Sequence, residues 1–261
     1  MSLALKNIVL TRANKRLVDQ VTLTFIPGKL TVLMGENGAG KSSLMKIASS
    51  EITPDSGTVA LGDKSFTDWS RRDRAKCLAV LPQESNVAFM FSAFEVVLMG
   101  RSPHCSGYPN AIDREIADAA LAKMGVAHLK NRLFPTLSGG ERARVSLARV
   151  FAQLWQPVAK GTRYLLLDEP VAALDIAHQH LVLDVARQFA HEEGAAVAVV
   201  LHDLNLAAQY ADTVVLIKAG RVAANGSVAD TLTEDILSQC FSTAIRRIAH
   251  PDDGRPLLFA A

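Results

Sequence analysis

Gly35-Glu36-Asn37-Gly38-Ala39-Gly40-Lys41-Ser42 is the stretch on which the fold of this chain depends. It fits the phosphate-binding pattern G-x-x-x-x-G-K-[ST] at every fixed position. The short apolar run 30–34 before it predicts a buried strand, and the run 43–48 after it predicts the first turns of a helix. A strand, a glycine-rich loop and a helix in this order aim backbone N–H groups and the positive helix end at a polyphosphate. The sequence therefore predicts an α/β fold built around a phosphate-binding loop.

The side chains of this loop have different expected tasks. Lys41 is expected to reach the β- and γ-phosphates, and the Ser42 hydroxyl is expected to bind Mg²⁺. The glycines allow the backbone to approach the anion closely. The residues expected around the phosphates are Gly35, Glu36, Asn37, Gly38, Ala39, Gly40, Lys41, Ser42 and Ser43.

Composition narrows the class of protein. Hydrophobic residues make up 49% of the 261, which is enough for a sizeable core. The net charge is only +2, from 28 basic and 26 acidic residues, so nothing favours a nucleic-acid partner. No apolar run approaches the roughly 18 residues needed to span a bilayer, and the N-terminus lacks a signal-peptide layout. We therefore expect a cytoplasmic protein without a membrane span of its own.

A second acidic signal lies far along the chain. The apolar run 164–167 predicts a strand, and Asp168 and Glu169 follow it directly. Asp168 is expected to hold Mg²⁺ through a water, and Glu169 is placed to polarise an attacking water as a general base. Many strands end in a solvated acid, so this signal has weight only beside the phosphate loop.

Between the two signals lies Leu137-Ser138-Gly139-Gly140-Glu141, followed by a helical pattern. Its apolar stripe consists of Leu147, Val150, Phe151 and Leu154. Ser-Gly-Gly at a helix start offers open N–H groups to an anion. The plainer alternative is an ordinary helix cap in which Glu141 is the capping acid.

Taken together, these motifs resemble the nucleotide-binding subunit of ATP-binding cassette transporters, over nearly the whole chain. The resemblance rests on order and spacing of 35–42, Gln83, 137–141, 165–169, Ala173-Leu174-Asp175 and His202. It implies the P-loop ATPase fold with a mixed-sheet core and a helical subdomain, and an ATPase that uses ATP and Mg²⁺.

In such cassettes two subunits face head to tail, with ATP between them. The resemblance implies that Ser138, Gly139 and Gly140 contact nucleotide held by the partner, and that Asp175 crosses the interface. Gln83 resembles the glutamine that senses Mg²⁺ and the membrane subunit. His202 resembles the histidine that contacts the γ-phosphate, beside the base Glu169.

The chain is expected to form one domain. Residues of about 1–83 and 164–226 would form the core, with an antiparallel N-terminal part and a hairpin turn at 218–221. Residues of about 84–137 would form a helical insert, including an exposed amphipathic helix at 111–124, and the signature helix would follow at 138–155. A short tail would occupy about 227–261.

Two departures from the family pattern stand out. Arg12 lies where many cassettes stack an aromatic residue on adenine; an arginine could stack there or simply be exposed. The loop Val171-Ala172-Ala173-Leu174-Asp175 has alanine where serine is common, which alters one possible interfacial hydrogen bond.

The class of transporter is also a matter of resemblance. Pro82-Gln83, the stretch 96–104 and the stretch 202–207 resemble importers of ferric siderophores, heme and cobalamin. The long connection 151–163, with Ala152-Gln153-Leu154-Trp155, resembles the heme importers, so heme ranks first, ferric siderophore second and cobalamin third. A neutral loop extension is the alternative. The apolar stretch 87–94 is either ordinary core or a groove for a membrane partner.

The implied partners are a second ATPase subunit, an inner-membrane permease dimer and, indirectly, a periplasmic heme-binding protein. The protein would then lie at the cytoplasmic face of the inner membrane. Cassette ATPases without a transport role are disfavoured. The interval 42–137 is too short for the coiled coil of DNA-repair types, and the ribosome-associated types usually carry two cassettes.

Overall fold

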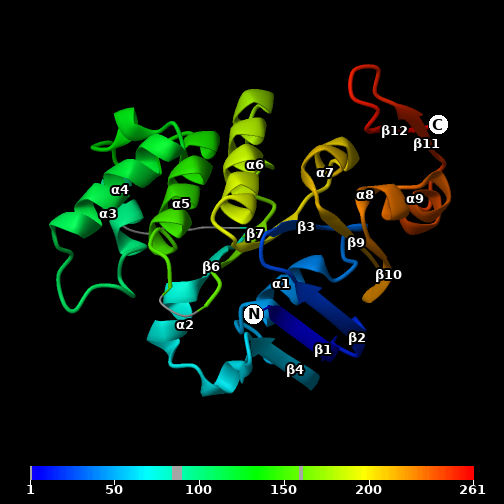
Figure 1. Cartoon of the computed structure of the whole chain (residues 1–261), viewed down its shortest axis with the longest axis horizontal. Helices are drawn as coiled ribbons and strands as arrows, with labels where there is room; N and C mark the ends of the chain where they lie inside the picture. The colour runs from blue at the N-terminus through cyan, green and yellow to red at the C-terminus, as the bar shows by residue number, and fades with distance from the viewer. Residues whose placement is uncertain (1, 84–89, 159–160) are drawn as a thin grey trace.

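Two sheets form the framework of the protein. The computed structural model describes residues 2–83, 90–158 and 161–261 (Figure 1). The larger sheet has six strands in the order β10-β9-β3-β8-β7-β6. Their bounds are β3 Lys29–Met34, β6 Leu78–Leu81, β7 Tyr164–Asp168, β8 Ala196–Val200, β9 Thr213–Lys218 and β10 Arg221–Gly226. All its pairs are parallel except β9 with β10, so the predicted mixed sheet is confirmed.

The parallel strands are buried on both faces, as their almost continuous apolar sequences require. Every residue of β7 and of β8 is buried. The predicted turn at 218–221 is also confirmed: Ala219 and Gly220 both have positive φ, 48° and 78°, between β9 and β10. Two consecutive residues with positive φ are the geometry of a tight hairpin turn.

The antiparallel N-terminal part is a separate four-stranded sheet in the order β2-β1-β4-β5. Its strands are β1 Leu3–Arg12, β2 Lys15–Phe25, β4 Ser56–Leu61 and β5 Lys64–Ser65. Apolar residues of β1 and β2 pack with helix α1 (Lys41–Ala48) and with the larger sheet in one buried cluster. The helices η1 (Phe66–Asp68) and α2 (Arg71–Cys77) then lead to β6.

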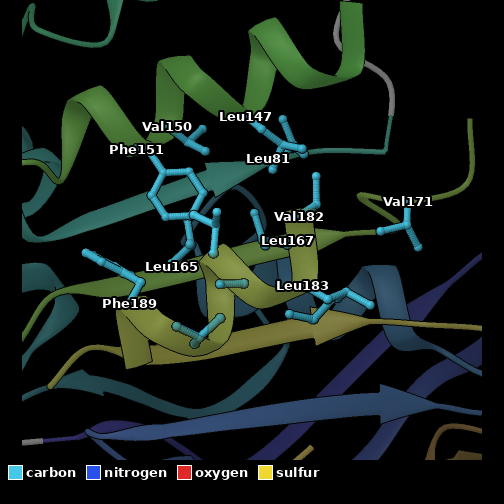
Figure 2. Close-up of a cluster of buried hydrophobic side chains, with 14 of the residues drawn as sticks. Leu81, Leu147, Val150, Phe151, Leu165, Leu167, Val171, Val182, Leu183 and Phe189 are labelled. Atoms are coloured by element: carbon cyan, nitrogen blue, oxygen red, sulfur yellow. The ribbon is translucent and has the colours of Figure 1, made fainter. Parts of the chain in front are cut away.

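Between β6 and β7, the described residues form three α-helices: α3 Ala93–Met99, α4 Ala111–Lys123 and α5 Gly139–Gln153. Two short 3₁₀ turns, η2 Ala127–Leu129 and η3 Phe134–Thr136, join α4 to α5. The predicted helix at 111–124 is confirmed, with one buried face that includes Ile116 and Leu121. Each side chain of the apolar stripe of α5 is at most 2% exposed. The stripe faces β7 and helix α6 (Ile176–His191), as Figure 2 shows for Leu147, Val150 and Phe151.

The end of α5 is held by buried polar side chains. Arg101, 1% exposed, donates to Asp113, to the carbonyl of Ala152 at 2.7 Å and to the side chain of Gln156. Gln153 donates through Nε2 to the carbonyl oxygens of Ala75 in α2 and of Leu78 at the start of β6. At the start of the long connection 151–163, the main chain is therefore held at Ala152 and the side chain is held at Gln153.

The segment expected as a tail is folded and joins the main core. It contains α8 Val228–Thr231, α9 Glu234–Phe241 and a hairpin of β11 Ile245–Ala249 with β12 Pro256–Ala260. Its buried members in the main core are Leu232, Leu237, Cys240, Ile245 and Leu258. The hairpin lies beside α7 (Leu204–Tyr210) (Figure 1). No helix in the described part of the chain combines the length and the apolar character needed to cross a membrane.

Candidate active site

The phosphate loop joins the end of β3 to the start of α1, in the middle of the larger sheet (Figure 1). Gly35 has φ 148° and Gly40 has φ 108°. A Cβ atom on Gly35 would lie 2.0 Å from the Ile217 carbonyl oxygen, and one on Gly40 would lie 2.4 Å from the Leu17 carbonyl oxygen. Both positions therefore require glycine. Gly40 is also the N-cap of α1 and has no side chain to accept from the first backbone N–H groups, which leaves them for an anion.

Lys41 is the buried cation of this loop. Its side chain is folded over the loop, and Nζ donates to the carbonyl oxygens of Gly35 at 2.9 Å and Glu36 at 3.0 Å. Burial lowers the pKa of Lys41, while the nearby carboxylates of Glu169 and Asp168 act in the opposite direction. A buried ammonium group held by two carbonyl oxygens can exchange them for phosphate oxygens.

Asp168 is the last residue of β7 and is 4% exposed. Burial raises the pKa of its carboxyl group, and a hydrogen bond with Ser42 opposes the shift. Within the described residues Oδ1 of Asp168 has no hydrogen-bond partner. A buried carboxylate oxygen without a partner, next to a hydroxyl, is a donor set that suits a hard divalent cation. The residues present therefore fit Mg²⁺.

Glu169 lies where three strand ends meet. Its Oε1 is 2.7 Å from Nε2 of His202, and its Oε2 accepts from Nε2 of Gln83 at 3.0 Å. Gln83 follows β6, Glu169 follows β7 and His202 follows β8, and these are adjacent parallel strands. Glu169 has φ 53°, a left-handed conformation that is uncommon for a residue with a side chain. The turn after Asp168 thus directs the second carboxylate toward the other two groups.

A cavity of about 710 Å³ joins the loop to these groups. It is lined by Leu17, Asn37, Gly38, Gly40, Lys41, Ser42, Ser43, Gln83, Glu169 and His202. Nine of these ten are residues predicted from the sequence for phosphate binding or catalysis; Leu17 is not. Leu17 belongs to β2, and its carbonyl packs against Gly40 and Gly220. No local motif marks it, because it reaches the cavity only through the packing of the two sheets.

The predicted signature residues lie outside this cavity. Ser138 is the N-cap of α5, and with Glu141 it forms a reciprocal capping box. Glu141 accepts from the Ser138 N–H at 2.7 Å. Gly139 lines a second cavity of about 320 Å³ beside Gln83, Asp168 and Glu169. The capping alternative from the sequence is therefore present in the structure.

Two further predicted positions have clear local roles. Asp175 is the N-cap of α6 and accepts from the backbone N–H of His178 at 2.9 Å; this bond is the first cause of its lowered pKa. Arg12 forms an ion pair with Asp55 at 3.2 Å, with both side chains about half exposed, and it does not line the 710 Å³ cavity. In the described part of the chain, Arg12 is thus directed to a carboxylate.

Comparison with known proteins places this geometry in a family. The family model described as ABC transporter matches residues 18–172. The chain is 51% identical over 246 residues to the hemin import ATP-binding protein HmuV of Gloeobacter violaceus, covering 94% of this chain and 89% of that protein. It is 45% identical over 258 residues to the protein of the same name from Myxococcus xanthus, covering 99% and 96%.

Solved structures share the fold at lower identity. An inward-facing putative metal-chelate type ABC transporter matches with a TM-score of 0.83 and 24% identity over 100% of this chain and 97% of that one. A dimeric ATP-binding cassette in a post-hydrolysis state, bound to ADP and phosphate, matches with a TM-score of 0.77 and 24% identity, covering 87% and 98%. These matches confirm the predicted fold class.

The matched family model, the two relatives of nearly full length and the shared fold agree with one another. The chain belongs to the ABC transporter family, and it is an ATP-binding subunit whose ATP hydrolysis is coupled to transport.

Proposed function

We propose that this protein is the ATP-hydrolysing subunit of a heme importer, bound at the cytoplasmic face of the inner membrane. The observation that carries the proposal is its 51% identity, over 94% of its length, to a hemin import ATP-binding protein. The ferric siderophore and cobalamin importers predicted as alternatives become outcomes of the test.

The two segments whose resemblance suggested heme lie against each other in the structure. Arg101 donates to the Ala152 carbonyl, and Nε2 of His104 lies 2.8 Å from the Gln153 carbonyl oxygen. The stretch 96–104 and the start of the connection 151–163, which were distinguished separately in the sequence, are therefore in contact. They form one structural unit of the chain.

The proposed binding of ATP begins at the phosphate loop. The open N–H groups of α1 and the ammonium of Lys41 receive the β- and γ-phosphates. Ser42, Asp168 and the amide oxygen of Gln83 are the groups that would hold Mg²⁺. When bound, Mg²⁺ neutralises phosphate charge and polarises the γ-phosphate.

Hydrolysis would then depend on Glu169 as general base for the attacking water. Its carboxylate is held on one oxygen by His202 and on the other by Gln83. These contacts fix the direction of the carboxylate, and positioning of this kind is the main protein contribution to phosphoryl transfer. His202 would also contact the γ-phosphate from the end of β8.

The complete site is proposed to form between two copies of the chain. Ser138, Gly139 and Gly140 do not line the 710 Å³ cavity, so they are free to meet nucleotide held by the partner. Asp175 would cross the same interface. The proposed interface accounts for a signature that is far in sequence from the phosphate loop.

Coupling to the permease dimer is proposed to run through Gln83 and the neighbouring apolar stretch. Residues 87–89 of that stretch lie outside the described residues. Met90 is 67% exposed, while Phe91 and Phe94 are partly buried against the core. An exposed apolar side chain a few residues after Gln83 in the sequence suits a contact with the end of a permease helix.

Reconstitution tests the proposal. The protein is assembled with its permease in vesicles, and a heme-loaded periplasmic binding protein is added. Heme-stimulated ATP hydrolysis and heme uptake should both appear, and both should vanish with Glu169→Gln. Stimulation by a ferric siderophore or by cobalamin, without a response to heme, would overturn the substrate and leave the ATPase assignment intact.

A further inference from the structure

The C-terminal hairpin has two edges, and side chains from different helices cover each of them. On the β11 edge, the backbone N–H of Ile245 donates to Ser238 at 3.0 Å, and that of Arg247 donates to Glu234 at 2.7 Å. Both acceptors lie on α9. These two side-chain acceptors satisfy backbone groups that an open strand edge would leave unpaired.

On the β12 edge, the side chain that bonds to the strand backbone is that of Asn205. Its Nδ2 donates to the Leu258 carbonyl oxygen at 3.1 Å, and its Oδ1 accepts from the Leu258 N–H at 2.8 Å. The amide therefore pairs with both main-chain groups of Leu258, as a neighbouring strand would. Leu258 is 4% exposed and belongs to the main core, so this contact is anchored at its far end.

Asn205 also lies three residues after His202, in the first turn of α7. Asp203, the N-cap between them, accepts from the backbone N–H groups of Asn205 at 2.7 Å and Leu206 at 3.0 Å. His202 is joined directly to this capped turn, and its ring meets Glu169. The position of the turn thus fixes where the imidazole can lie.

We propose that Asn205 is a positioning residue for ATP hydrolysis, which ties the first turn of α7 to the C-terminal hairpin and so holds His202 against Glu169. This inference rests on the proposed function of Glu169 and His202. Asn205 does not line the 710 Å³ cavity, so it acts through His202 and not on nucleotide. The hairpin is then part of the catalytic framework although it contributes no group to the site.

Steady-state hydrolysis by the full-length protein with Asn205→Ala tests the inference. Loss of two hydrogen bonds should lower kcat about three- to tenfold, while KM for ATP changes by less than about twofold. The matched control is Ser238→Ala, which removes a hydrogen bond from the opposite edge of the hairpin and leaves the link to α7. Its kcat should stay near the parent value.

Two further readouts separate positioning from general loosening. The NMR ring signals of His202 should shift in Asn205→Ala and stay in place in Ser238→Ala. In a His202→Ala background, Asn205→Ala should have no further effect on kcat. Should Asn205→Ala fail to fold, Asn205→Asp replaces it in the same comparison. This variant keeps the acceptor for the Leu258 N–H but places a carboxylate oxygen, in place of the amide donor, next to the Leu258 carbonyl oxygen.

An unchanged kcat in Asn205→Ala, beside an impaired His202→Ala, would overturn this inference alone. Equal loss in Asn205→Ala and Ser238→Ala would also overturn it, because the hairpin would then act only through overall stability. Near-parent hydrolysis by His202→Ala would instead contradict the proposed role of His202.

Discussion

At the scale of single residues, Glu169 is held by hydrogen bonds on both carboxylate oxygens, from Gln83 and His202. Glu169→Gln preserves the size of the side chain and removes its ability to take a proton from water. We expect ATP binding to persist while hydrolysis falls about 10²-fold or more. Nucleotide binding and single-turnover hydrolysis, measured beside the exposed control Glu192→Gln, check this. Near-normal turnover would remove Glu169 from the role of base.

Arg12 is a residue for which a small effect is expected. It pairs with Asp55 at 3.2 Å with both side chains about half exposed, and an exposed cation–aromatic contact contributes only about 0.5–1 kcal/mol. Arg12→Ala should therefore weaken ATP binding by less than about tenfold, since tenfold is about 1.4 kcal/mol. Equilibrium titration with ATP measures it. A larger loss would mean that Arg12 leaves Asp55 and stacks on adenine.

Individual residues of the candidate site could be predicted wherever the functional residues lie next to one another in a sequence motif. Asp168 ends one strand and Glu169 follows it, while Lys41 and Ser42 begin one helix, so neighbours in the chain are neighbours in space. Leu17 lies in no such motif, and Asn205 lies in the stretch 202–207, where nothing in the sequence marks its contact with Leu258. Leu17 contacts Gly40, 23 residues later in the sequence, and Asn205 contacts Leu258, 53 residues later.

At the scale of elements, the end of α5 depends on Arg101. This guanidinium is 1% exposed and pairs with Asp113, itself 4% exposed in its side chain. Arg101→Met would leave the Asp113 carboxylate buried without its cation. Removing one partner of a buried pair destabilises by about 3–5 kcal/mol.

Chemical denaturation of Arg101→Met measures that loss. The matched control is Arg71→Met, an exposed arginine of α2, which should change stability by no more than about 0.5 kcal/mol. Equal stability of the two variants would show that Asp113 finds other partners. The carboxyl group also accepts from the Asn110 N–H at 3.0 Å. This bond remains in Arg101→Met and limits the loss of stability.

Helices and strands were predictable where the apolar pattern extends over enough residues. The stripe of α5 and the continuous apolar strands β7 and β8 are examples. The order of strands in the sheet was not predictable, because β3 lies between β8 and β9, which come more than 160 residues later. The folding of residues 227–261 was missed for a related reason: its few apolar residues gain burial only from the core they join.

At the scale of the whole molecule, the signature and the phosphate loop are expected to act across two copies. Lys41→Ala and Ser138→Arg should each abolish hydrolysis in homodimers. Mixing the two gives heterodimers with one site built from intact halves and one site damaged in both halves. Partial recovery of ATP hydrolysis in the mixture is the expected result.

Hydrolysis is measured against the mixing ratio, with each variant alone as the control. Recovery should be greatest at an equal ratio, where heterodimers are most abundant. Full activity of Ser138→Arg alone would contradict a shared site. In this chain, Ser138 caps α5, so the helicity of the variant is compared with that of the parent by circular dichroism.

The left-handed backbone of Glu169, with φ 53°, lowers the stability of the fold at the residue on which ATP hydrolysis depends. A side chain in that conformation stores about 1–3 kcal/mol of strain. Glycine would relieve the strain and make the chain more robust, but it would remove the base. Selection for thermal resistance alone would therefore favour a stable ATP-binding protein that no longer hydrolyses ATP. The strain at Glu169 is a loss of folding stability that the protein keeps because hydrolysis needs a carboxylate at this position.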